Sequence, residues 1–303
     1  MVHDEPADPY GPQMLVHQKA ADGNGKLERG LGRHLPKWGT EPQANMDDWH
    51  WLTSLNQARA VSYGMAHLRS WYPLNQGSIV WQLNDNWPVI SWAAVDGHGI
   101  RKPLWFAMRA VYAERLLTVQ PRRDATGTEV PTLAAHNDSP EPWSGEVLVT
   151  RRSTLAGSEV LAEQRLPFRT DPRSAVLLAL DTAITTPADP RQEVVEVTAP
   201  GAAPAYWYFV EDTELVLAPA AEAAQVTVAP TDGGYRVTVS ASALVKDVTL
   251  FPDRLDPAAR VDSALVTLLN GQSHTFEVAS GPLDEVALTS KPVLRSVNEV
   301  TAG

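Results

Sequence analysis

Trp81-Gln82-Leu83-Asn84-Asp85-Asn86-Trp87-Pro88 is the most informative stretch of this sequence. It begins within an apolar run, residues 77–83, whose β-branched and aromatic side chains are typical of a strand buried on both faces. The Asn, Asp and Pro residues that follow favour a loop. The sequence therefore predicts a buried strand that ends in a polar loop.

Helical patterns lie on both sides of this stretch. Asn45 and the acidic residues after it favour a helix start, and apolar positions at helical spacing continue to Trp71, before Tyr72-Pro73. A second helix is predicted to begin at Lys102-Pro103, because proline is tolerated in the first helical turn. Helix, buried strand, loop and helix is the order of elements in a (β/α)8, or TIM, barrel.

Residues 1–116 are therefore predicted to be an α/β remnant of a TIM barrel, its C-terminal part. Within them, residues 1–44 are rich in Gly, Pro and Asn and predict a long irregular segment with a short helix near residues 26–35. One strand and two helices cannot close a barrel. An apolar, Trp-rich face over residues 45–115 is therefore expected to be exposed, and to favour association, unless it docks on another surface.

The rest of the chain has an all-β pattern. Residues 117–220 predict an immunoglobulin-like β-sandwich and residues 221–303 a second, smaller β-sandwich, joined by a linker near residues 219–224. Trp143 and Trp207 are expected in the sandwich core. Strands are expected within residues 143–150, 175–180, 194–197, 206–210, 225–229, 235–241, 248–251, 265–269, 274–278 and 286–288.

Composition excludes several classes of function. The net charge is −11, and residues 121–303 hold 14 Lys/Arg against 25 Asp/Glu, so no basic face for nucleic acid is expected. The absence of cysteine excludes disulfides and fits a cytoplasmic location. No apolar run approaches the roughly 20 residues needed to cross a bilayer, so no membrane partner is expected. The histidines show no metal-ligand spacing, and neither a metal nor a cofactor is predicted.

The stretch Trp81–Pro88, with Ser91-Trp92 and Asp96, closely resembles the last barrel strand and loop of the β-mannosidases of glycoside hydrolase family 2, which typically show Trp-Gln-Leu-Asn-Asp-Cys-Trp-Pro. Asn86 stands where these enzymes commonly have cysteine. Three further segments resemble the family: residues 15–25 the segment after its seventh strand, and residues 250–253 and 292–294 the domains after its barrel.

The resemblance implies the C-terminal portion of a retaining exo-glycosidase that hydrolyses terminal β-D-mannosides. Such an enzyme needs two carboxylates roughly 5–5.5 Å apart, a nucleophile and an acid/base. The resemblance implies that they are a Glu after an Asn on the fourth barrel strand and the Glu of a Ser-Glu-aromatic-Gly stretch on the seventh, and neither motif occurs in residues 1–116. Glu5, Glu28 and Glu41 are the only glutamates before Glu114. We therefore expect no catalytic residue in this chain, the missing stretch to lie upstream of Met1, and the chain alone to be an inactive fragment.

Five residues are predicted to bind substrate in the parent enzyme. Trp81 would stack on the apolar face of a sugar, although a core tryptophan is the alternative interpretation. Asn84 and Asp85 would bond sugar hydroxyls, or only hold the loop. His17 and Gln18 could reach the site from the preceding loop, where a histidine is more often structural. Trp87 and Trp92 are expected to pack the loop against the barrel.

Three hypotheses about function remain open from the sequence. The chain could be part of a longer enzyme, a separate subunit that complements an N-terminal half, or a non-catalytic carbohydrate-binding or structural β-sandwich protein. The expected partner of the full-length parent enzyme is its carbohydrate substrate, a β-mannoside.

Overall fold

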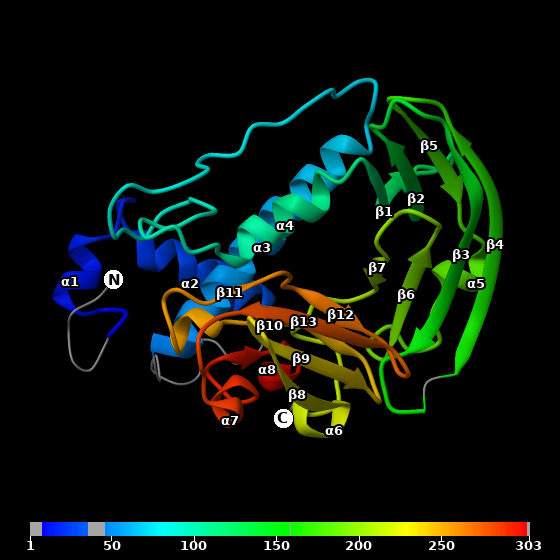
Figure 1. Ribbon diagram of the computed structural model, residues 1–303. Coiled ribbons are helices and arrows are strands. Elements are labelled where there is room, and N and C mark those ends of the chain that lie inside the picture. Colours follow the sequence, from blue (N-terminus) through cyan, green and yellow to red (C-terminus); the bar gives the residue numbers. More distant parts are fainter. Residues whose placement is uncertain (1–7, 36–45, 158, 302–303) are drawn as a thin grey trace.

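The computed structural model describes residues 8–35, 46–157 and 159–301. Helices dominate the first third of the chain and β-sheets the rest (Figure 1). In the described part of the chain, no helix has the length and apolarity required to span a membrane.

Four helices form the N-terminal region: α1 (Pro12–Val16), α2 (Gly23–His34), α3 (Met46–Arg69) and α4 (Pro103–Val111). The helix predicted after Asn45 is confirmed as α3, with 24 residues, and the one predicted at Lys102-Pro103 as α4. The short helix predicted near residues 26–35 is confirmed as α2, whereas α1 lies in the part of residues 1–44 that was expected to be irregular. Asn45 itself lies outside the described residues.

The buried strand predicted over residues 77–83 is not formed. Only isolated bridges pair the neighbouring residues, such as Asn84 with Val95. Ile79 is 99% exposed and Trp81 72% exposed. A strand of a parallel sheet needs neighbouring strands to bond its backbone, and the described residues place none beside this segment. Figure 1 shows it as a long loop, in cyan, that follows α3.

Two β-sheets follow the helical region and share one apolar core. A three-stranded sheet has the order β1-β2-β5 and a four-stranded sheet the order β4-β3-β6-β7, with all neighbours antiparallel. Trp143 lies in this core, as predicted, with its indole N–H donating to Pro200 O at 2.9 Å, and Trp207 packs against the core. The elements are β1 (Arg115–Arg123), β2 (Glu129–Asn137), β3 (Trp143–Ser153), β4 (Val160–Thr170), β5 (Ser174–Ala179), α5 (Thr182–Thr185), β6 (Glu193–Thr198) and β7 (Ala205–Tyr208).

The C-terminal region contains two more sheets, with orders β11-β13-β9-β8 and β12-β10-β14. Phe276 is fully buried in their common core. The strand predicted at residues 286–288 is wrong, because this segment is the short helix α7 (Glu285–Leu288). Asp284 caps it by accepting bonds from the N–H groups of Val286 and Ala287. The elements are α6 (Ala220–Ala223), β8 (Ala224–Thr231), β9 (Gly234–Ala241), β10 (Val245–Leu250), η1 (Pro252–Arg254), β11 (Arg260–Val261), β12 (Val266–Leu268), β13 (Ser273–Ala279), α7, β14 (Leu294–Arg295) and α8 (Asn298–Thr301).

Helix α3 contacts both sheet regions along its whole length. Near its start, Asp48 accepts a bond from Arg295 at 2.6 Å. In its middle, Arg59 pairs with Asp212 and Asp247.

At the end of α3, Arg69 donates to Asp138 at 2.7 Å and to His136 at 3.0 Å. Trp51 is fully buried between the helices and the C-terminal sheets, 5.8 Å from the ring of Phe251. Helices and sheets are therefore joined by a shared apolar core and by ion pairs.

Candidate functional site

The loop after Leu83 doubles back on itself and is held by its own backbone. Asp85 N–H donates to Val95 O at 3.0 Å, and Val95 N–H donates to Leu83 O at 3.0 Å. Lys102 N–H donates to Ala94 O at 2.9 Å, directly before α4. The loop is therefore ordered without the sheet that was expected to support it.

Asp85 is the buried polar centre of this loop, at 7% exposure. Its Oδ2 accepts a bond from the Ser91 hydroxyl and lies 3.8 Å from Lys102 Nζ, while Oδ1 lies 4.0 Å from Lys19 Nζ. Burial lowers the pKa of Lys102, against the opposing effect of Asp85. Asp85 thus connects residues 19, 91 and 102, and its Oδ1 has no hydrogen-bond partner.

Trp81 and Asn84 lie on the exposed side of the same loop. The indole of Trp81 faces solvent, so it is not a core tryptophan in this chain. The Trp81–Gln82 peptide bond is cis, and Gln82 accepts a bond from Lys19 Nζ at 3.0 Å. Asn84 is exposed, and its amide donates to Asp85 O at 3.2 Å. Of the groups predicted to bind a sugar on this loop, the indole of Trp81 and the amide of Asn84 are therefore accessible, whereas the carboxylate of Asp85 is buried.

His17 and Gln18 lie beside this loop. Gln18 forms a parallel bridge with Ile90, in which Ile90 N–H donates to His17 O at 3.0 Å. The ring of His17 contacts Pro88 O and lies 5.4 Å from the ring of Trp87. The structure therefore brings all five predicted binding residues to one region. Trp87 is 42% exposed and Trp92 is 44% exposed, so these two residues pack the loop against the rest of the protein only in part.

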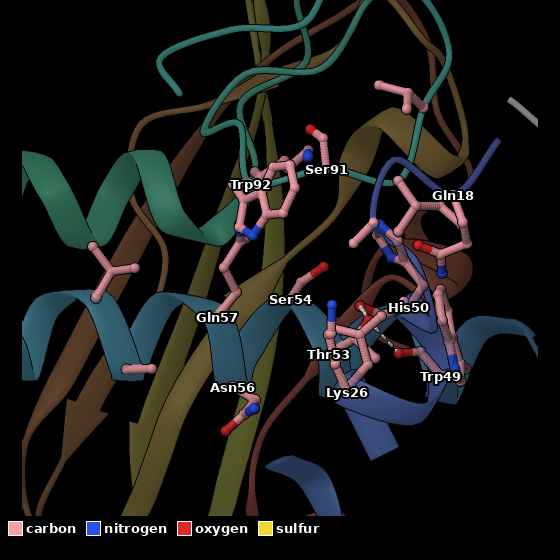
Figure 2. A pocket seen from close by; sticks show the side chains of 18 residues that line it. Gln18, Lys26, Trp49, His50, Thr53, Ser54, Asn56, Gln57, Ser91 and Trp92 are labelled. Atoms are coloured by element: carbon pink, nitrogen blue, oxygen red, sulfur yellow. Dashed lines mark hydrogen bonds between the residues drawn. The ribbon is translucent and has the colours of Figure 1, made fainter. Parts of the chain in front are cut away.

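A pocket of about 360 Å3 adjoins this region, between α2, α3 and residues 89–92. Figure 2 shows Trp92 between the loop and α3, with Gln18 on another side of the opening, while the Ser91 hydroxyl points away from α3. Most of the wall is apolar, and Ser91 and Lys102 belong both to this wall and to the contacts of Asp85. The pocket and the Asp85 cluster are therefore parts of one site.

Sequence reasoning missed the contribution of α3 to this pocket. His50, Thr53 and Gln57 line it from one helix face, which the sequence pattern had not singled out. Their spacing of three and four residues was a signal that they share a face. Nothing in the sequence indicated that α2 and the loop would lie opposite them. Among the described residues, no group of three or more His, Asp and Glu side chains could hold a metal ion.

His50 makes folding sensitive to pH. Burial, together with the charges of Arg254 and Lys102, lowers the pKa of His50 from 6.5 to about 3. The unfolded chain therefore binds a proton at a higher pH than the folded chain, and stability is lost as the pH falls from about 6.5 to about 3.

We expect this loss to be of the order of 3–5 kcal/mol in the free energy of unfolding. Urea unfolding of the wild type and of His50→Gln, measured across this pH range, checks the prediction. The variant should lose most of this pH dependence, and equal slopes for both proteins would contradict it.

Known proteins resemble this chain in sequence and in fold. No family model matches the chain. A β-mannosidase B of Aspergillus flavus is 35% identical over 111 residues, 35% of this chain and 12% of that protein, and the one of Aspergillus niger is 34% identical over 106 residues, also 12% of its length. The crystal structure of the β-D-mannosidase of Dictyoglomus thermophilum matches 97% of this chain and 35% of its own, with a TM-score of 0.74 at 19% identity. By sequence and by fold, this chain is β-mannosidase-like.

The resemblance to the C-terminal part of β-mannosidases of glycoside hydrolase family 2 is thereby confirmed. The exo-chitosanase of Amycolatopsis orientalis also has this fold, with a TM-score of 0.62 over 93% of this chain at 14% identity. The β-mannosidase-like chain is mostly β-sheet with few helices. It spans 12% of the length of the curated relatives and 35% of the D. thermophilum chain.

Proposed function

We propose that this chain forms one wall of the sugar site of a retaining exo-glycosidase that hydrolyses terminal β-D-mannosides. The observation that supports it most is the exposed indole of Trp81 beside the ordered polar loop at Asn84 and Asp85, in a β-mannosidase-like chain. The proposal includes the expected domains: the C-terminal part of the catalytic barrel in residues 1–116, and immunoglobulin-like sandwiches in residues 117–220 and 221–303. The cytoplasmic location stays a prediction.

The chain would contribute positioning and leave bond cleavage to carboxylates from elsewhere. Retaining hydrolysis needs two carboxyl groups about 5–5.5 Å apart. Asp85 is one carboxylate, and both of its oxygens face groups of this chain: the Ser91 hydroxyl and the ammonium groups of Lys19 and Lys102. A single carboxylate cannot be both the nucleophile and the acid/base, so Asp85 alone does not supply the chemistry.

Trp81 would provide the apolar floor of the subsite. An indole face packs against the C–H face of a pyranose, while neighbouring polar groups bond its hydroxyls. Among the described residues, none donates a hydrogen bond to the amide oxygen of Asn84, so this oxygen would accept one from a sugar hydroxyl; the amide nitrogen donates to Asp85 O. Gln18 and His17 lie one short loop away and would complete the polar rim. Such contacts hold the reacting sugar in a fixed orientation, which lowers the entropic part of the barrier.

The proposal is tested by nuclear magnetic resonance on the purified chain. We expect methyl β-D-mannopyranoside, at up to about 50 mM, to shift the indole N–H signal of Trp81, because a single wall of a site gives only millimolar affinity. Trp81→Ala should abolish binding, while Trp71→Ala, which alters another exposed tryptophan, should not. A chromogenic β-mannoside should give no turnover with the chain alone.

Two outcomes would contradict the proposal. One is a Trp81 signal that stays unchanged throughout the titration. The other is a set of shifts confined to β8–β14, which would favour a non-catalytic carbohydrate-binding protein instead.

A further inference from the structure

The pocket between α2, α3 and residues 89–92 is lined by cationic and not by anionic side chains. Among the described residues that line it are two lysines, Lys26 and Lys102, but no Asp or Glu. The whole chain has 36 Asp and Glu against 25 Lys and Arg, so this lining differs from the rest of the protein. The volume of about 360 Å3 lies within the range of small-molecule sites.

Lys102 is a largely buried ammonium group that lacks a hydrogen bond. Its side chain is 16% exposed, and the Asp85 carboxylate remains 3.8 Å away, beyond hydrogen-bond distance. None of the described residues accepts a hydrogen bond from its Nζ. Burial lowers the pKa of Lys102, against the opposing effects of Asp85 and Asp96. The ammonium group has therefore lost water without gaining an acceptor, and a bound anion would supply one.

Two further N–H donors line the pocket from the start of α3. Trp49 is 3% exposed, and its indole N–H has no partner within the described part of the chain. The Arg254 guanidinium donates to Nδ1 of His50 at 2.9 Å, so the neutral imidazole carries its proton on Nε2. No acceptor for this Nε2–H is found among the described residues. The lining therefore presents donors that need an acceptor.

The remaining wall suits a flat, apolar group. Trp92 lies between the loop and α3 (Figure 2), and Leu27, Val61 and Val89 line other parts of the pocket. Indole rings make favourable stacked or edge contacts with other aromatic rings. An apolar wall with a few convergent polar groups is typical of a site that orients a small molecule.

We infer that this pocket binds a small aromatic carboxylate, with the carboxylate at Lys102 and the ring against Trp92. The inference goes beyond the proposed function and does not depend on it, because Trp81 and Asn84 are not among the described residues that line the pocket. A neutral sugar fits the pocket less well. It brings no charge to Lys102, and its hydroxyl groups would lose water against an apolar wall.

The test is a nuclear magnetic resonance titration of the purified chain with 3-phenylpropionate. We expect a Kd of about 1 mM or below and shifts of the indole N–H signals of Trp49 and Trp92. The neutral analogue 3-phenylpropan-1-ol has the same ring and chain without the charge. It should bind at least about tenfold more weakly.

Lys102→Met should weaken binding of 3-phenylpropionate by at least about tenfold and leave the affinity for the alcohol unchanged, because it removes only the charge. Binding of the alcohol also shows that the pocket of the variant is intact. Lys19→Met is the matched control. Lys19 Nζ also lies beside Asp85, 4.0 Å from Oδ1, but Lys19 does not belong to the described lining, so the variant should keep the wild-type affinity.

Trp92→Ala tests the ring contact separately from the charge. It should weaken the acid and the alcohol alike, because both would lose the same indole. Trp92 is 44% exposed, so the variant should fold normally.

Four results would overturn the inference: equal affinities for the acid and the alcohol, an affinity for the acid that Lys102→Met leaves unchanged, an equal loss in Lys19→Met, or full binding by Trp92→Ala. Displacement of 3-phenylpropionate by methyl β-D-mannopyranoside would also overturn it, because a neutral sugar would then occupy the pocket. The Trp81 titration tests the proposed function separately, so either proposal can fail without the other.

Discussion

Replacing Arg59 by Ala is expected to lower the free energy of unfolding by about 3 kcal/mol, because it leaves buried carboxylates without a counter-charge. Arg59 Nε donates to Asp247 at 2.8 Å, and its terminal nitrogens contact both Asp247 and Asp212. Asp212 has a side chain only 4% exposed. This loss of stability lies at the lower end of the range for breaking a buried ion pair, because Lys246 still contacts Asp212 in the variant.

The ion pairs of Asp212 with Arg59 and Lys246 also affect the stability of the fold at acidic pH. Burial alone would raise the pKa of Asp212, but Arg59 and Lys246 together lower it from 3.8 to about 2. A carboxyl group with a lowered pKa stabilises the fold above its unfolded value and loses that contribution as the pH falls through the folded value. The stabilisation is therefore lost between about pH 4 and pH 2, and Arg59→Ala should reduce that loss.

Urea unfolding at pH 7 and pH 3 measures both effects. Arg165→Ala is the control, because Arg165 also contacts two carboxylates, Glu146 and Glu163, but at the exposed surface of the protein. Exposed ion pairs contribute little to stability. Similar unfolding curves for the two variants at pH 7 would refute the role given to the Arg59 cluster.

Trp51→Ala is expected to cost about 3–5 kcal/mol, as large-to-small substitutions of buried aromatic residues do. Trp51 is fully buried and packs with Leu31, Leu55 and Phe251, so its side chain joins α2, α3 and the C-terminal sheets. Trp51→Phe should cost much less, about 1–2 kcal/mol. It leaves a smaller cavity and removes an indole N–H that has no hydrogen-bond partner.

Thermal unfolding followed by circular dichroism distinguishes these variants. Trp92→Ala, at a tryptophan that is 44% exposed, should shift the midpoint least. We also expect one cooperative transition in every variant, because the core around Trp51 is common to helices and sheets. Two separate transitions in Trp51→Ala would show that the helical and β regions fold independently.

The sequence predicted those elements whose signals are local. The acids after Asn45, the proline at the start of α4 and the alternation along β3, β6 and β9 all correspond to observed elements. The glycine-rich helix α2 corresponds to the short helix predicted near residues 26–35, and burial of Leu31 against Trp51 outweighs its weak helix propensity. Residues 77–83 have the composition of a buried strand, but β structure requires neighbours that the described residues do not provide.

The site was predictable to a similar extent. The motif indicated which residues gather around Trp81, and the structure does bring Gln18 and His17 to the loop. It could not indicate that Lys19 and Lys102 approach Asp85 from two directions, since neither lies near it in the sequence. The sequence could not predict the pocket either, because its walls come from helices and a loop whose packing depends on the whole fold.

The contacts of α3 have a mechanical consequence. At about 1.5 Å per residue, this 24-residue helix is a rod roughly 36 Å long, fastened to the sheets near its start, middle and end by Asp48, Arg59 and Arg69. Contacts at three positions prevent the helix from rotating about any one of them. Deleting residues 225–303 would remove Asp247, a partner of Arg59, and Arg295, the partner of Asp48. The C-terminal sheets are therefore not a module that can be removed without loosening α3.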